Sequence, residues 1–224
     1  MKKRGLLALA LLLGCSHALR IPKLVDPGLR DDSIAFDMRY AGDDNFVGSR
    51  IDGYLASRCL LSDQAAGALI DIQRELRSRD LGLLVYDCYR PQRAVDHFVL
   101  WANDLADERT KADYYPAIDK SRLIELGYIA AKSGHSRGST IDLTLIKRGR
   151  DAKWTPLDMG TVFDFFDSSS NTESGDVTQL QRSNRFLLRD VMERGGFQNF
   201  PKEWWHYTLR DEPYPNDYWN LPIR

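Results

Sequence analysis

The sequence predicts a single α+β domain with a mostly antiparallel sheet flanked by helices. Its 224 residues are 43% hydrophobic and 28% charged, the composition of an ordinary globular domain that is long enough to bury a full core. Helical patterns come first and strand patterns cluster late, without regular strand–helix–strand alternation. The chain also lacks an internal repeat and a linker rich in Pro, Gly or Ser, so we expect one domain.

The first residues are typical of a secretory signal peptide. Three basic residues precede the apolar run 6–13, which is too short to span a bilayer. Two cleavage sites compete: Cys15 follows Leu-Leu-Gly, as in a bacterial lipobox, and residues 16–18 resemble an ordinary small-x-small site. We expect a signal peptide within residues 1–18, ending before Cys15 if that cysteine is lipidated, and a mature domain over residues 19–224.

These signals predict a protein of the periplasm, lipid-anchored to the outer membrane because Ser, not Asp, follows Cys15. Either cut leaves 28 basic against 32 acidic residues in the mature chain. This balance and a pI of about 6.4 argue against a nucleic-acid partner. The mature chain keeps Cys59 and Cys88, which either form a disulfide in an oxidising compartment or remain separate buried thiols.

The elements follow from local patterns. Residues 19–58 carry turn signals and predict irregular structure. Ser62 is a plausible N-cap for a helix whose apolar residues recur at helical spacing before Gly82. Residues 83–88 form a short apolar run typical of a buried strand, and Pro91 fits the first turn of a second helix. The apolar stripe of that helix comprises Ala94, Phe98, Trp101 and Leu105.

Residues 139–146 alternate between apolar and polar side chains, as in a strand with two different faces. Asp142 lies on the polar face, where its carboxylate must meet either solvent or a cation. Residues 178–194 predict a third helix that ends at Gly195. Its aligned apolar residues are Leu180, Leu187 and Val191. Residues 204–209 are aromatic and favour a final strand.

Two histidines lie among other residues that can bind metal. His135 lies in a glycine-flanked turn just before the strand that carries Asp142, and His206 follows Glu203 after two tryptophans. Two imidazoles and one carboxylate form the ligand set of an open catalytic zinc site, with water in the fourth position. Glu203 would then be the unligated carboxylate that accepts a proton from that water. To converge with His206, Glu203 must lie in a turn before the strand, because residues three apart on a strand face opposite ways.

Four segments of the chain together form a specific set of motifs: YDCYRPQRA at 86–94, SGHSRGSTID at 133–142, EWWH at 203–206 and RDEPYPN at 210–216. They resemble the VanX-type D-alanyl-D-alanine dipeptidases, a family similar to the wider group of zinc D,D-peptidases that share a fold with hedgehog signalling domains. The SxHxxGxxxD and ExxH spacings are both intact, and the resemblance runs from about Asp37 to the C terminus.

The resemblance implies zinc-dependent hydrolysis of D-Ala-D-Ala to two D-alanines, with one zinc ion per chain. By position, His135, Asp142 and His206 match the zinc ligands of the family, and Glu203 matches its catalytic base. The substrate partner is then a small dipeptide.

Further positions match residues that contact the substrate. Arg90 matches the arginine that stabilises the charged transition state, although an ion pair with Asp87 is the structural alternative. Tyr40, Ser133 and Asp164 match the positions that hold the free ammonium group of the substrate. An anionic pocket of this kind rejects longer peptides, because a chain extended at that end has lost the charge.

Two other functions stay open at this point. One is a zinc D,D-carboxypeptidase that acts on peptidoglycan stem peptides, and the other is a zinc-stabilised binding domain without turnover. Glu203 and Arg90 argue against the second, because a purely structural site needs neither. The signal peptide departs from the cytoplasmic resistance-associated members of the family. It favours D-alanine recovery during cell-wall turnover over glycopeptide resistance.

Overall fold

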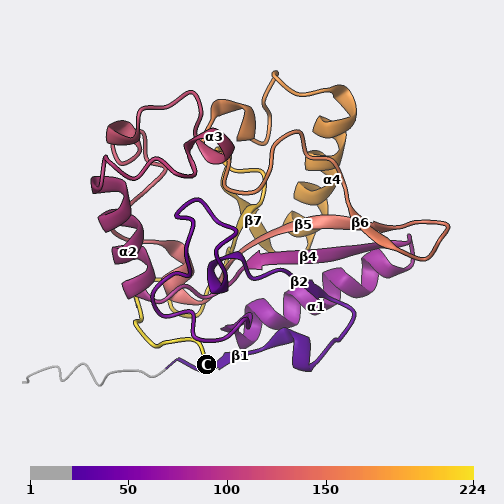
Figure 1. Cartoon of the computed structure of the whole chain (residues 1–224). Coiled ribbons are helices and arrows are strands. Elements are labelled where there is room, and N and C mark those ends of the chain that lie inside the picture. The colour runs from indigo at the N-terminus through magenta and orange to yellow at the C-terminus, as the bar shows by residue number, and fades with distance from the viewer. Residues whose placement is uncertain (1–21) are drawn as a thin grey trace, which may run out of the picture.

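The computed structural model describes residues 22–224, and its centre is a six-stranded sheet (Figure 1). The strands of this sheet are β2 (Ala35–Phe36), β4 (Leu81–Asp87), β5 (Thr140–Arg148), β6 (Trp154–Pro156), β7 (Phe197–Asn199) and β8 (His206–Leu209). They lie in the order β2-β4-β5-β8-β7, with β6 paired to β5. Only β2 and β4 pair in parallel, which confirms the predicted mostly antiparallel sheet.

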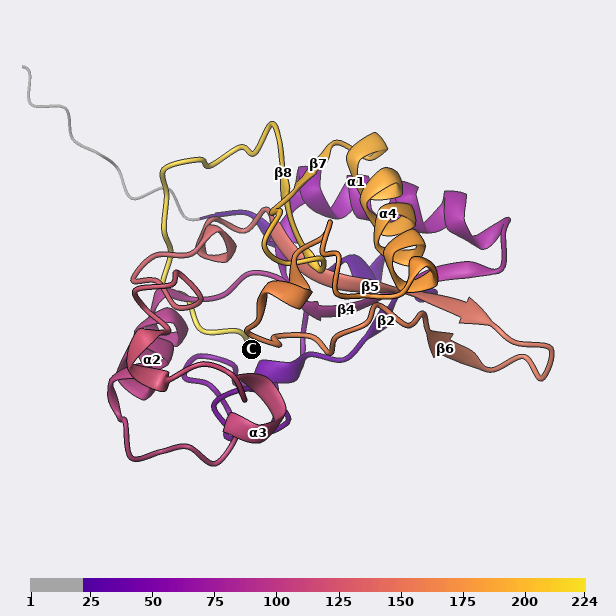
Figure 2. The ribbon, with the colours of Figure 1, turned by 90° about the horizontal axis from the view of Figure 1, so that it is seen from above.

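Helices and a small second sheet surround this centre. The α-helices are α1 (Asp63–Arg77), α2 (Gln92–Asn103), α3 (Lys111–Tyr114) and α4 (Gln179–Arg194). The short 3-10 helices are η1 (Pro27–Leu29), η2 (Arg39–Ala41), η3 (Lys120–Arg122), η4 (Gly134–Arg137) and η5 (Ser168–Ser170). Strands β1 (Leu24–Val25) and β3 (Leu61–Ser62) pair with each other. Seen from above, α1 and α4 lie along the same side of β4 and β5, while α2 and α3 lie beyond one end of these strands (Figure 2).

The first helix forms as the sequence predicts. The Ser62 hydroxyl accepts a hydrogen bond from the backbone N–H of Ala65 at 3.3 Å, so it caps α1. The predicted apolar face of α1 is fully buried against β4 and β3.

Cys59 and Cys88 form a disulfide with a Cα–Cα distance of 5.2 Å. Of the two alternatives for these cysteines, the structure therefore contains the disulfide and not separate thiols.

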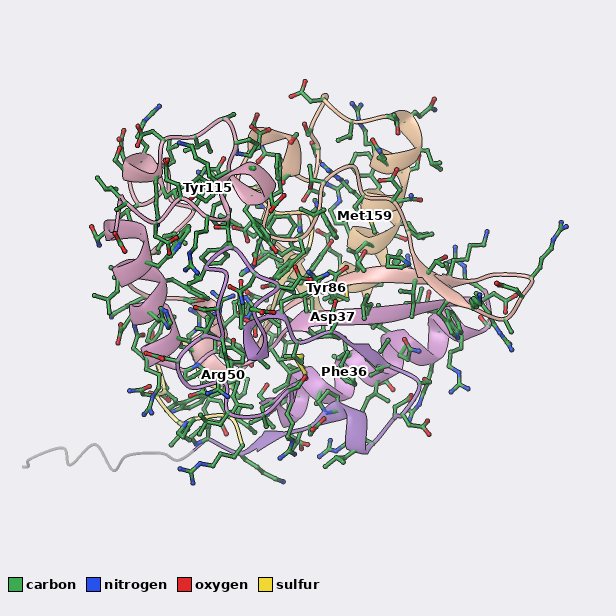
Figure 3. All side chains as sticks on the ribbon, viewed as in Figure 1. Phe36, Asp37, Arg50, Tyr86, Tyr115 and Met159 are labelled. Atoms are coloured by element: carbon green, nitrogen blue, oxygen red, sulfur yellow. A yellow bond between two sulfur atoms is a disulfide. The ribbon has the colours of Figure 1, made fainter. Side chains whose placement is uncertain are left out.

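The apolar stripe of α2 is correct for three of its four residues. Ala94, Phe98 and Trp101 are buried, but Leu105 lies beyond the end of the helix and is 54% exposed. The helix ends earlier because the backbone of Asp104 turns away and its carbonyl oxygen accepts a hydrogen bond from Lys120 Nζ at 2.8 Å. Aromatic rings pack beside α2, where Trp101 contacts Tyr115, labelled in Figure 3.

The predicted apolar face of α4 is correct for two of its three residues. Its start is correct, because Thr178 and Gln181 form a capping box, but Leu180 is 68% exposed. Val191 is buried and Leu187 is half-buried against the core, and the buried face also includes Arg185 and Leu188. The guanidinium of Arg185 is buried because it donates hydrogen bonds to the carbonyl oxygens of three loop residues. These are Met159, Ser169 and Asn171.

Residues 1–21, which include the predicted signal peptide and Cys15, lie outside the described residues. Between residues 22 and 224, none of the helices is long and apolar enough to cross a membrane.

Candidate active site

Two neighbouring strands, β5 and β8, and the short helix η4 bring the predicted ligands together. Asp142 on β5 pairs in register with Asp87 at the end of β4 and with His206 at the start of β8. His135 comes from η4, immediately before β5. The polar face of β5 therefore turns toward a site rather than toward solvent, and Asp142 is only 1% exposed. The potential ligand atoms of His135, Asp142 and His206 all lie within 4.8 Å of one another.

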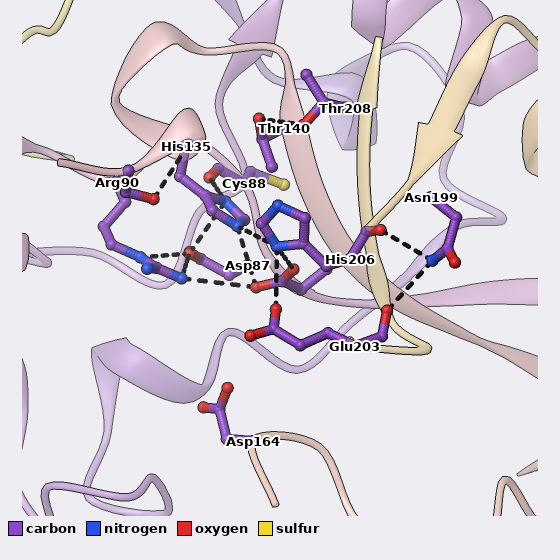
Figure 4. A network of polar contacts seen from close by, with 12 residues as sticks. Asp87, Cys88, Arg90, His135, Thr140, Asp164, Asn199, Glu203, His206 and Thr208 are labelled. Carbon is purple, nitrogen blue, oxygen red and sulfur yellow. Dashed lines mark hydrogen bonds and ion pairs between the residues drawn. The ribbon is translucent and has the colours of Figure 1, made fainter. Parts of the chain in front are cut away.

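The orientation of these ligand atoms fits a metal ion. His135 Nδ1 lies 2.6 Å from the carbonyl oxygen of Cys88, which can only accept, so Nδ1 carries the hydrogen and Nε2 presents a lone pair. Nε2 lies 3.2 Å from Asp142 Oδ2 and 3.4 Å from His206 Nδ1 (Figure 4). Asp142 Oδ1 lies 3.0 Å from His206 Nδ1 but has no properly oriented hydrogen-bond donor among residues 22–224.

Burial alone would raise the pKa of the Asp142 carboxyl, but His135 and His206 hold it below its ordinary value, so this group is ionised. The residues present are thus two imidazoles and one carboxylate, with a hydrogen-bond acceptor behind one imidazole. This donor set and its outer hydrogen bond are those of a catalytic zinc site. The predicted zinc site fits the structure.

Glu203 lies in the turn before β8, as its required convergence with His206 predicted. Its Oε2 lies 3.4 Å from His206 Nδ1, in the same cavity as the ligands. Burial raises the pKa of Glu203, the negative charge of Asp142 adds to this effect, and the positive partners His206 and Arg90 oppose it. A carboxylate in this position suits a proton acceptor that is not a ligand.

Arg90 follows β4 and occupies one wall of the cavity. Its Nη2 lies 2.9 Å from Asp87 Oδ2 and 3.5 Å from Asp142 Oδ2. Its guanidinium carbon also lies 5.0 Å from the ring centres of Tyr40 and Phe98. The ion pair with Asp87 is therefore present, and it holds a guanidinium that lines the cavity, so the catalytic role of Arg90 stays a prediction.

Asp87 has a larger role in the site than the sequence predicted. It is completely buried, and its carboxylate accepts a 2.6 Å hydrogen bond from Tyr54 in addition to binding Arg90. Its Oδ2 also lies 3.4 Å from His135 Nδ1. A carboxylate at the end of an apolar strand, three residues before an arginine, was the available signal for this role.

Asp164 and Tyr40 form a second polar pair in the cavity. Asp164 Oδ2 accepts a hydrogen bond from the Tyr40 hydroxyl at 2.8 Å, and the Asp164 side chain is 5% exposed. Burial raises the pKa of Asp164 well above its ordinary value, and the charge of Asp142 raises it further. Ser133 lines the same cavity, and its hydroxyl accepts a hydrogen bond from the His135 backbone N–H at 3.3 Å.

The cavity has a volume of about 330 Å³ and collects seven of the eight predicted site residues. His135 is the exception: it is 1% exposed, and it contacts the cavity residues Asp142 and His206 through its Nε2. Apolar walls complete the cavity, and they include Phe46, Phe98, Phe166 and Trp205. Its size and its charged groups suit a small polar molecule.

Comparisons with known proteins agree with this site. The family Peptidase_M15, described as D-Ala-D-Ala dipeptidase, matches residues 28–224. The D-alanyl-D-alanine dipeptidase of Enterococcus faecium is 41% identical over 85% of this chain and 93% of its own length. That of Streptomyces coelicolor is 43% identical over the same shares, and that of Escherichia coli is 34% identical over 84% of each chain. The chain therefore belongs to the Peptidase_M15 family of D-Ala-D-Ala dipeptidases.

Proposed function

We propose that this protein hydrolyses D-alanyl-D-alanine to two molecules of D-alanine. The observation that supports this most is the shared cavity, in which the ligands and Glu203 lie together with the buried pair of Asp164 and Tyr40. The first group suits hydrolysis of an amide, and the second suits recognition of a free ammonium group. The curated relatives named D-alanyl-D-alanine dipeptidase support the same substrate.

The chemistry is divided among the residues of the cavity. A zinc ion held by His135, Asp142 and His206 would supply Lewis-acid polarisation of the scissile carbonyl and an acidified water. Glu203 accepts the proton of the attacking water and then delivers it to the departing amine. Arg90 faces the carbonyl oxygen, where its fixed positive charge stabilises the negative charge that develops in the transition state.

The buried pair accounts for selectivity toward a dipeptide. The carboxylate of Asp164 has no cation of its own within hydrogen-bonding distance among the described residues, whereas the substrate ammonium would supply one. Tyr40 and Ser133 offer hydroxyl groups beside it. A peptide extended at its amino end carries a neutral amide there and would leave Asp164 buried without a counter-charge, which is costly.

The decisive assay compares three substrates with zinc-loaded protein. D-Ala-D-Ala should be cleaved, while L-Ala-L-Ala and a pentapeptide ending in D-Ala-D-Ala should be poor substrates. Preferential cleavage of the pentapeptide would favour a D,D-carboxypeptidase. Zinc binding without cleavage of any of the three would favour a binding domain.

We also propose that the mature protein acts in the periplasm, attached to the outer membrane through a lipid on Cys15, and recovers D-alanine during cell-wall turnover. The pattern of the first 18 residues supports export. The disulfide between Cys59 and Cys88 supports an oxidising compartment. Activity should fractionate with membranes, and Cys15→Ala should release it or block processing. A full-length, uncleaved chain active in the cytosol would refute this location.

A further inference from the structure

The proposed catalytic base lies in a short turn, and one proposed metal ligand immediately follows that turn. Residues 200–205 connect β7 to β8, and Glu203 lies within this connection while His206 follows it. The distance between the carboxylate of Glu203 and the imidazole of His206 therefore depends on the backbone of the turn. Within the turn, the N–H of Glu203 donates to the Phe200 carbonyl at 3.0 Å, and the N–H of His206 donates to the Glu203 carbonyl at 3.3 Å.

Asn199, the last residue of β7, binds both Glu203 within this turn and His206 after it. Its Nδ2 lies 3.2 Å from the carbonyl oxygen of Glu203 and 3.1 Å from that of His206 (Figure 4). An amide nitrogen carries two hydrogens, so each carbonyl can receive one of them. Because both partners can only accept, the amide nitrogen must face the turn, and the oxygen Oδ1 must face away.

Thr172 fixes the other half of this amide. Its hydroxyl donates to Asn199 Oδ1 at 2.7 Å, and its backbone N–H donates to the carbonyl of Pro201 within the turn at 2.9 Å. Both side chains are shielded from water, with Thr172 at 1% and Asn199 at 8% exposure. Competition from solvent for these bonds is therefore small, and the turn has one preferred conformation.

We propose that Asn199 is a positioning residue that sets the separation of Glu203 from His206, with Thr172 holding its amide in the required orientation. Asn199 does not line the cavity and so does not touch the substrate; it acts through the backbone of the two residues that do. The expected effect on kcat rests on the proposed hydrolysis. The expected effect on zinc binding by His206 does not depend on it.

The test measures zinc affinity by competition with a chelator, and kcat and KM on D-Ala-D-Ala, for Asn199→Asp and Asn199→Ala. Asn199→Asp keeps the shape but places a carboxylate oxygen against two carbonyl oxygens. We expect kcat to fall by roughly tenfold or more and zinc affinity to fall by roughly 10–100-fold, the range typical of groups that orient metal ligands. KM should stay nearly constant, because Tyr40, Ser133 and Asp164 lie on other segments.

Two variants of Thr172 test the proposal even if the Asn199 variants fail to fold. Thr172→Val loses the hydroxyl that orients the amide, so it should lower kcat and zinc affinity in the same direction, whereas Thr172→Ser keeps the hydroxyl and should restore both. Gln198→Ala, an exposed position on the same strand, is the control that should match the wild type.

Wild-type zinc affinity and kcat in Thr172→Val, or a rise in KM alone in the Asn199 variants, would overturn the proposal. If the wild-type protein failed to cleave D-Ala-D-Ala, the proposed function would be wrong, and the zinc affinities would still decide the role of Asn199.

Discussion

Asp164→Asn tests whether a buried carboxylate recognises the ammonium group of the substrate. Asp164 is 5% exposed, and the Tyr40 hydroxyl is its one hydrogen-bond donor in the described part of the chain. The replacement preserves the shape of the side chain. It also suits the backbone, because residue 164 has a left-handed φ of 61° and asparagine tolerates that region well. The substitution therefore changes charge with little change in structure.

The expected loss follows from the energetics of buried ion pairs. Removing one partner of such a pair costs about 3–5 kcal/mol, which corresponds to a loss in kcat/KM of roughly 10²–10⁴-fold. N-acetyl-D-Ala-D-Ala carries no ammonium group, so the wild type should cleave it poorly and Asp164→Asn should make little further difference. The measurement is release of D-alanine from both substrates by both proteins. If Asp164→Asn preferred D-Ala-D-Ala over N-acetyl-D-Ala-D-Ala by the same ratio of kcat/KM as the wild type, the assignment would be refuted.

The same substitution should raise the stability of the protein, although it lowers the activity. Burial raises the pKa of Asp164 well above its ordinary value, so the native state binds the proton more tightly than the unfolded state does. Ionisation therefore costs stability as the pH rises through the raised pKa, and the cost is absent below the ordinary pKa of aspartate, where both states are protonated. The melting temperature of Asp164→Asn should exceed that of the wild type increasingly as the pH rises. Calorimetry across pH measures this difference.

Four further predictions concern the reaction centre. Glu203→Ala should keep its zinc and lose turnover by roughly 10²–10⁴-fold, the usual contribution of a general base, and loss of the metal would instead make Glu203 a ligand. His206→Ala should lose zinc in elemental analysis together with activity; retention of both would exclude it from the ligand set. Arg90→Lys should lower kcat by roughly 10²-fold because an ammonium cannot bind Asp87 and face the substrate together, and near-normal kinetics would leave Arg90 only its ion pair. Burial raises the pKa of Glu203, and the base must be ionised, so kcat/KM should rise with pH with an apparent pKa above that of ordinary glutamate. An apparent pKa equal to that of ordinary glutamate would contradict the assignment of this rise to buried Glu203.

The metal site was predictable because its residues lie in local patterns. The alternation of β5 placed Asp142 on the face opposite the apolar residues, and the spacing between Glu203 and His206 required the turn that the structure contains. In both cases neighbouring residues on one strand or turn determine the geometry. Local patterns of this kind are visible without knowledge of the tertiary fold.

Other features depend on contacts between distant segments. The buried face of α4 extends to Arg185 because its guanidinium binds carbonyl groups of residues that precede the helix, and periodicity counts arginine as polar. Asn199 also escaped notice, because its partners are backbone carbonyls of a turn whose path the sequence does not specify. Pairing of Cys59 with Cys88 required a Cα–Cα distance that only the fold provides.

The row formed by Asp87, Asp142 and His206 across three strands has a consequence for biosynthesis. These residues are far apart in the chain, and His206 is the last of them to be synthesised. A growing polypeptide therefore has no complete ligand set until β8 has been synthesised and has paired in register with β5. Metal capture then reports the pairing of β8 with β5, and fragments split between these two strands should regain it only when combined.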